Sequence, residues 1–113
     1  MQDNITNIGL KEELIKELKQ IFSSSENIES VILFGSRAKG NFKNGSDIDL
    51  AIKGKDLILK DIYSLQNKID DLNLPHTFDI QIYNDIKEPA LKEHIDRVGI
   101  VIYTKKNNLN SYN

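Results

Sequence analysis

The sequence of 113 residues contains no cysteine and no tryptophan, and only two prolines. Without cysteine there is no disulfide scaffold, no thiol nucleophile and no cysteine-ligated zinc. No apolar run approaches the roughly 18 residues of a transmembrane helix, and the polar start MQDNITN is unlike a signal peptide. The formal net charge of −2 argues against general electrostatic binding of nucleic acid. We therefore expect a cytoplasmic protein that binds no membrane and makes no direct contact with nucleic acid.

The composition that remains is typical of one globular domain. Hydrophobic residues make up 39% of the chain and charged residues 28%, which argues against disorder. A chain of this length buries about two-thirds of its surface on folding, enough for one core. We expect a single domain over residues 1–113, with an ordered core at about 10–103 and polar tails.

Hydrophobic spacing predicts the element order α-β-β-α-β-α-β. The expected helices cover 10–22, 56–72 (with Asp56 as N-cap) and 88–98, and the expected strands cover 28–34, 47–52, 78–83 and 100–103. Asn44-Gly45 favours an antiparallel pairing of the first two strands. The predicted fold class is α/β (α+β): a small mixed sheet of about four strands, with helices packed mainly on one face and 100–103 at an edge.

Three features could carry chemistry together. Gly35-Ser36 directly follows a buried strand, where a glycine lets the backbone approach an anionic ligand closely. Asp47 and Asp49 share one face of the next strand, with Cα atoms ~6.6 Å apart by strand rise. Asp79 lies on the same kind of face in the third strand, so pairing of the two strands would gather three carboxylates. Taken alone, each feature is better explained by an ordinary turn or a solvated strand face, and only the three together favour a nucleotide-metal site.

Gathered carboxylates favour a hard cation. At ~6 Å and an effective dielectric of ~20, each pair repels by about 3 kcal/mol. Mg²⁺ relieves this with few protein carboxylates plus water and phosphate oxygens, and two ions ~3.5–4 Å apart are an alternative. Arg37, Lys39 and Lys43 would form a cationic rim for a polyphosphate, although ordinary solvation explains them as well. The sequence lacks a P-loop, an EF-hand and a G-x-G-x-x-G, and the isolated His76 and His94 do not read as zinc ligands.

The segment LFGSRAKGNFKNGSDIDLAI resembles the signature of the DNA polymerase β-like nucleotidyltransferase superfamily, and HIDRVGIVIY and the short length look most like its minimal nucleotidyltransferase (MNT) proteins. The resemblance covers about Leu10 to Tyr103 and implies the polymerase β-like fold. It also implies roles for individual residues. The nucleotide-binding residues would be Gly35 and Ser36, at the β- and γ-phosphates, with Arg37, Lys39 and Ser46; the catalytic and Mg²⁺-binding residues would be Asp47, Asp49 and Asp79.

The resemblance implies an adenylyltransferase that moves AMP from ATP to a hydroxyl group and releases pyrophosphate. Such minimal proteins are commonly antitoxins, paired in a hetero-oligomer with a HEPN ribonuclease toxin whose tyrosine they modify. Two alternatives stay open: a non-catalytic antitoxin that masks the toxin by contact, and an aminoglycoside-type small-molecule nucleotidyltransferase. The latter enzymes use further domains or dimer clefts for the acceptor, and 113 residues leave little for that.

Overall fold

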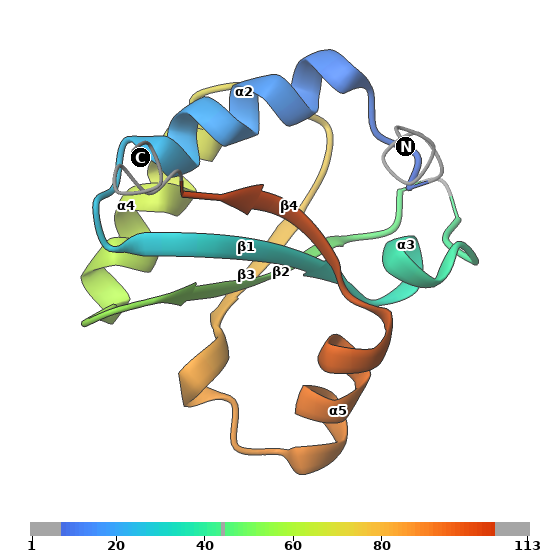
Figure 1. Cartoon of the computed structure of the whole chain (residues 1–113). Helices are drawn as coiled ribbons and strands as arrows, with labels where there is room; N and C mark the ends of the chain where they lie inside the picture. Colours follow the sequence, from blue (N-terminus) through green and yellow to red (C-terminus); the bar gives the residue numbers. More distant parts are fainter. Residues whose placement is uncertain (1–7, 44, 106–113) are drawn as a thin grey trace, which may run out of the picture.

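The computed structural model describes residues 8–43 and 45–105, which form a four-stranded sheet with helices on both faces (Figure 1). The elements in chain order are α2 (Glu12–Ser23), β1 (Ile28–Phe34), α3 (Ser36–Lys39), β2 (Ile48–Gly54), α4 (Leu59–Asp70), β3 (Phe78–Ile82), the 3₁₀ turn η1 (Tyr83–Asp85), α5 (Pro89–Val98) and β4 (Ile100–Thr104). The predicted α/β class and element order are confirmed, with α3 and η1 as short additions.

The strand order is β3-β2-β1-β4, so β4 forms one edge of the sheet, as expected. β1 pairs antiparallel with both β2 and β4, whereas β2 and β3 run parallel. The predicted antiparallel pairing of the first two strands is therefore confirmed; Gly45 has a φ of +87°, and its neighbour Asn44 lies outside the described residues. The parallel pair matters most for function, because it sets the starts of β2 and β3 side by side.

The two faces of the sheet carry separate hydrophobic clusters. The larger one lies under α2 and α4, where Leu18, Phe22 and Leu50 are completely buried. The smaller cluster includes Phe34 and Ala51 and is covered by Ile95 of α5. Figure 1 shows α2 above the sheet and α5 below it, and residues of α4 share the larger cluster with those of α2. The two longest helices therefore share one face, and α5 takes the other.

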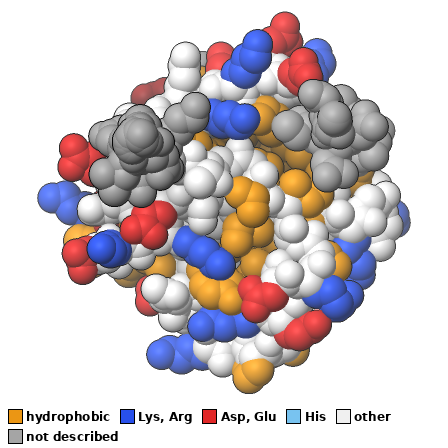
Figure 2. All heavy atoms as spheres, viewed as in Figure 1, with side chains coloured by type: hydrophobic (Ala, Val, Ile, Leu, Met, Phe, Trp, Pro, Cys, Tyr) orange, Lys and Arg blue, Asp and Glu red, His pale blue; other side chains and the backbone are white. Residues whose placement is uncertain are grey.

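Hydrophobic side chains also reach the surface near the middle of the face that β4 crosses (Figure 2). Val101 on this edge strand is 58% exposed. Of the helices in the described part of the chain, none combines the length and the apolar character needed to cross a membrane.

The predicted N-cap of the second long helix is wrong. Asp56 has a φ of +56°, a left-handed conformation in the loop, and α4 begins three residues later at Leu59. The carboxylate of Asp61 instead accepts a 2.9 Å hydrogen bond from the Ile58 N–H. An acid in the first turn thus satisfies an otherwise free helical donor from inside the helix.

Candidate active site

The turn between β1 and α3 brings the backbone next to a carboxylate. Gly35 has φ +80° and ψ −156°, a conformation essentially restricted to glycine. A Cβ atom at this position would collide with the carboxylate of Asp49. Ser36 begins a single helical turn, and its carbonyl accepts hydrogen bonds from Gly40 N at 3.0 Å and Asn41 N at 3.2 Å. Glycine is therefore required here both for the backbone angle and for the close approach to Asp49.

The three predicted acidic residues lie at the same end of the sheet. Asp49 is paired with Phe34 at the end of β1 on one side and with Asp79 of β3 on the other. Asp47 precedes β2 by one position and, like Asp79, is exposed to solvent, whereas Asp49 is partly buried. The parallel register thus sets Asp79 directly across from Asp49.

The electrostatics of Asp49 show that the three acids interact. Burial raises the pKa of Asp49 above its ordinary value, and the negative charges of Asp79 and then Asp47 raise it further. The folded protein therefore holds a carboxylate whose charge is unfavourable, in a place where a cationic partner would relieve it. Such strain among acids is typical of functional sites.

The donor set fits a hard divalent cation in its chemistry. Mg²⁺ takes oxygen ligands and needs only one or two carboxylates when phosphates and water supply the rest. Among residues 8–43 and 45–105, however, no three acidic or histidine side chains are arranged to hold a metal ion. Because like charges repel, carboxylates converge closely only around a cation. Asp47, Asp49 and Asp79 offer the carboxylate oxygens that could bind such a cation at this end of the sheet.

Arg37 occupies a different place from the one that its sequence position suggested. Its side chain is 3% exposed, and its guanidinium donates to the carbonyl of Ile8 at 2.9 Å and to that of Ser46 at 3.1 and 3.3 Å. It also lies 4.9 Å from the centre of the Phe42 ring. Arg37 thus fastens the 36–46 loop from inside instead of presenting its charge to a ligand.

Of the other residues predicted to bind nucleotide, Ser46 closes the loop and Lys39 is exposed to solvent. The hydroxyl of Ser46 accepts a 2.8 Å hydrogen bond from Lys43 N, which closes the turn that precedes β2. Lys39 and Lys43 are exposed, so their charges are available at the surface. Burial lowers the pKa of the His76 imidazole, and the positive charge of Arg37 lowers it further.

His94 of α5 is a contact that sequence reasoning missed. Its Nε2 accepts a 3.1 Å hydrogen bond from the backbone N–H of Gly35, and its ring stands edge-on to Phe34 with centroids 6.2 Å apart. The two partners are 59 positions apart in the chain. No local pattern could have revealed this contact, because it depends on α5 folding under the sheet.

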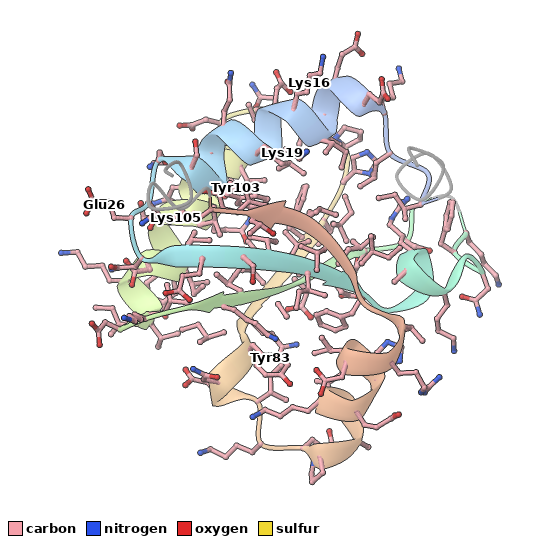
Figure 3. All side chains as sticks on the ribbon, in the orientation of Figure 1. Lys16, Lys19, Glu26, Tyr83, Tyr103 and Lys105 are labelled. Atoms are coloured by element: carbon pink, nitrogen blue, oxygen red, sulfur yellow. The ribbon has the colours of Figure 1, made fainter. Side chains whose placement is uncertain are left out.

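Tyr83 shares a strand face with Asp79 but does not join the acids. It follows the far end of β3, about 13 Å along the strand from Asp79. Its hydroxyl donates a 2.8 Å hydrogen bond to Asp96 of α5, and the Nζ atoms of Lys53 and Lys92 lie 4.4 and 5.0 Å from the ring centre. Figure 3 shows Tyr83 below the sheet, beside α5. Tyr83 therefore ties α5 to the sheet away from the acidic end.

Comparison with known proteins gives concordant results. Residues 16–108 match the profile of the family described as polymerase beta, nucleotidyltransferase. A curated relative, the candidate protein adenylyltransferase MJ1217 of Methanocaldococcus jannaschii, is 32% identical over 91 residues, covering 80% of this chain and 92% of the relative.

Two solved structures share the fold at low sequence identity. One is a toxin–antitoxin structure with AMP-PNP, with a TM-score of 0.64 and 20% identity over 90% of this chain and 79% of the other. The second is a tri-AMPylated HEPN toxin of Shewanella oneidensis in complex with an MNT antitoxin, with a TM-score of 0.54 and 19% identity over 98% of this chain and 77% of the other. The predicted polymerase β-like nucleotidyltransferase fold is therefore confirmed.

Proposed function

This chain belongs to the polymerase β nucleotidyltransferase family, and from that premise we propose that it transfers AMP from ATP to a hydroxyl group of a partner protein. One observation carries the proposal: the backbone of Gly35 is packed against Asp49, and Asp49 is paired with Asp79. A glycine turn suited to phosphate and a cluster of acids suited to a divalent cation thus meet at one place.

Each residue at this place has a definite task in the proposed reaction. Gly35 and Ser36 would bind the β- and γ-phosphates of ATP, with the exposed Lys39 nearby. Asp47 and Asp49 would hold Mg²⁺, which supplies charge neutralisation between the carboxylates and the phosphates. Asp79 would complete this site or accept the proton of the attacking hydroxyl group. We assign Arg37 and Ser46 to holding the loop, since their polar groups are engaged there.

The reaction is balanced without any further reagent. The acceptor oxygen forms a bond to the α-phosphorus of ATP, and the bond from that phosphorus to the oxygen bridging to the β-phosphate breaks. Pyrophosphate leaves with the bond electrons, and the hydroxyl proton passes to a carboxylate. The products are the adenylylated acceptor and pyrophosphate.

The M. jannaschii relative is described as a candidate protein adenylyltransferase, and this description supports a protein as the acceptor. The AMPylated HEPN toxin in one structural neighbour supports a HEPN-type toxin as the partner and an antitoxin role for this chain. Tyrosine is the acceptor that we propose, since the resemblance to MNT antitoxins implies a tyrosine of the toxin.

The test uses the full chain, α-labelled ATP, Mg²⁺ and the product of the adjacent gene. We expect label on that product, and at least a hundredfold less label with Asp47→Asn/Asp49→Asn. Asp56→Asn is the matched control, because it makes the same chemical change beyond the far end of β2, in an exposed loop. This control should leave the transfer unchanged.

Four results would contradict parts of the proposal. Absence of label with the unaltered chain would refute the transfer, and full transfer by the double variant would refute the roles of Asp47 and Asp49. Toxin neutralisation that survives the double change would favour masking by contact. Labelling of an aminoglycoside by the chain alone would favour a small-molecule acceptor.

A further inference from the structure

We propose that His94 is a positioning residue for nucleotide binding: its imidazole fixes the Gly35 backbone in the orientation that receives the β- and γ-phosphates. This inference rests on the proposed function, because it assigns a new residue to the same site. It extends that site from β1, β2 and β3 to α5, an element that supplies none of the predicted nucleotide-binding or metal-binding residues.

The hydrogen bond specifies the chemical state of His94. Nε2 accepts the Gly35 N–H at 3.1 Å, so Nε2 carries no proton and the neutral ring has its hydrogen on Nδ1. The bond is partly buried, where a hydrogen bond is stronger than one open to solvent. A neutral acceptor at this point holds the Gly35 amide without adding charge beside the acids.

The helix that carries the imidazole is held in place by three consecutive residues, of which His94 is the first. Its ring meets Phe34 at an interplanar angle of 79°, which is an edge-to-face arrangement. The next residue, Ile95, is 2% exposed, and Asp96 accepts the hydroxyl of Tyr83. Consecutive residues of α5 thus anchor the helix to β1, to the smaller core and to η1. Nε2 is therefore presented to Gly35 by a fixed helix.

The effect on the nucleotide follows from the geometry of Gly35. Its backbone packs against Asp49, and its N–H donates to His94. Glycine has the widest conformational freedom of any residue, so the peptide before Ser36 needs an external restraint. Losing the restraint would disorder the turn that receives the β- and γ-phosphates and would leave contacts to adenosine and the α-phosphate intact. Loss of His94 should therefore weaken the binding of a nucleoside triphosphate and leave the binding of a monophosphate unchanged.

The test measures the binding of two nucleotides in the presence of Mg²⁺. The non-hydrolysable analogue AMPCPP carries all three phosphates and is titrated by calorimetry, whereas AMP is measured by competition against AMPCPP. With His94→Ala we expect AMPCPP to bind about fivefold more weakly, equivalent to about 1 kcal/mol, and AMP to bind as before. His94→Gln should bind AMPCPP within about twofold of the unaltered chain, since its carbonyl oxygen offers an acceptor at a similar reach.

Glu93→Gln is the matched control on the same helix, because Glu93 is exposed and pairs only with Arg97 among the ion pairs of the described residues. It should change neither affinity. Equal weakening of AMP and AMPCPP by His94→Ala, no weakening of either, or failure of His94→Gln to restore binding would each overturn the inference. If the unaltered chain binds AMPCPP but transfers no AMP, the proposed function fails while the role of His94 stands. If it binds neither nucleotide, both fail.

Discussion

Replacing Gly35 with alanine should damage stability and activity together. The backbone at Gly35 has φ +80° and ψ −156°, and the new Cβ would collide with the Asp49 carboxylate. An L-residue held in such a region costs of order 1–3 kcal/mol. The new Cβ would also push aside the Asp49 carboxylate, which adds to this strain and displaces a proposed metal ligand.

Gly40 provides a matched comparison for the size of the effect. It has a similar φ of +85°, but a Cβ there would meet nothing within 4 Å. Gly40→Ala should therefore lower the free energy of unfolding by about 1 kcal/mol, the cost of the left-handed backbone alone. We expect Gly35→Ala to lower the free energy of unfolding by about 3 kcal/mol, which is roughly 2 kcal/mol more than the control.

Urea unfolding of both variants measures the difference, because the linear extrapolation gives the two free energies on one scale. The transfer assay is run in parallel, and Gly35→Ala should lose about a hundredfold in activity, the usual effect of misplacing a reacting group by about 1 Å. Gly40→Ala should retain most of its activity. Equal destabilisation by the two substitutions would refute the reasoning, as would normal activity of Gly35→Ala, since either result means that Asp49 does not confine this turn.

Four further substitutions test the loop and the acids. Arg37→Met should lower the free energy of unfolding by about 3 kcal/mol in urea, because it leaves the carbonyls of Ile8 and Ser46 without their buried donor; a loss below about 1 kcal/mol would contradict the assigned role. Asp79→Asn should lower the pKa of Asp49 in a carboxyl NMR titration, and by more than Asp47→Asn does, because Asp79 is the stronger of the two charges acting on it. Since the folded pKa of Asp49 is raised, folding is opposed by this group at neutral pH and the opposition is relieved as pH falls through that pKa. Asp49→Asn should therefore increase the free energy of unfolding at pH 7 by about 0.5 kcal/mol, limited by solvent screening, and the increase should shrink on acidification.

Much of the fold was predictable because the decisive signals are local. The apolar run at 31–34 identified β1 at its observed bounds, and the alternation of Ile48, Leu50 and Ile52 identified β2 to within two residues. The burial of Ala51 on the other face of β2 was not predicted, because it depends on the cover that α5 gives that face. The start of α4 was predicted wrongly, because Asp56 has the right chemistry for an N-cap but adopts a loop conformation. Several residues near a helix start can satisfy the same free N–H groups, and tertiary packing chooses among them.

The candidate site was predictable as far as its residues lie on neighbouring strands. Asp49 and Asp79 follow from strand alternation once β2 and β3 are paired. The contribution of His94 was not predictable, because it requires α5 to lie on the face opposite α2 and α4. Arg37 was misjudged for a related reason: a guanidinium in a glycine-rich loop is usually solvated, and only the folded chain brings the carbonyls of Ile8, before α2, and of Ser46, in the loop, to this side chain.

The late position of α5 and β4 in the chain has a consequence for biosynthesis. β1 emerges from the ribosome early, yet its second partner, β4, and the histidine that holds the end of its turn come after almost all the rest. Until translation passes Thr104, the nascent sheet has an open flank at β1, and exposed strand flanks invite wrong pairing. The second neighbour of β1 and the histidine that holds the Gly35 turn are therefore available only after α5 and β4 have been synthesised, so the two contacts are gained late in folding on the ribosome.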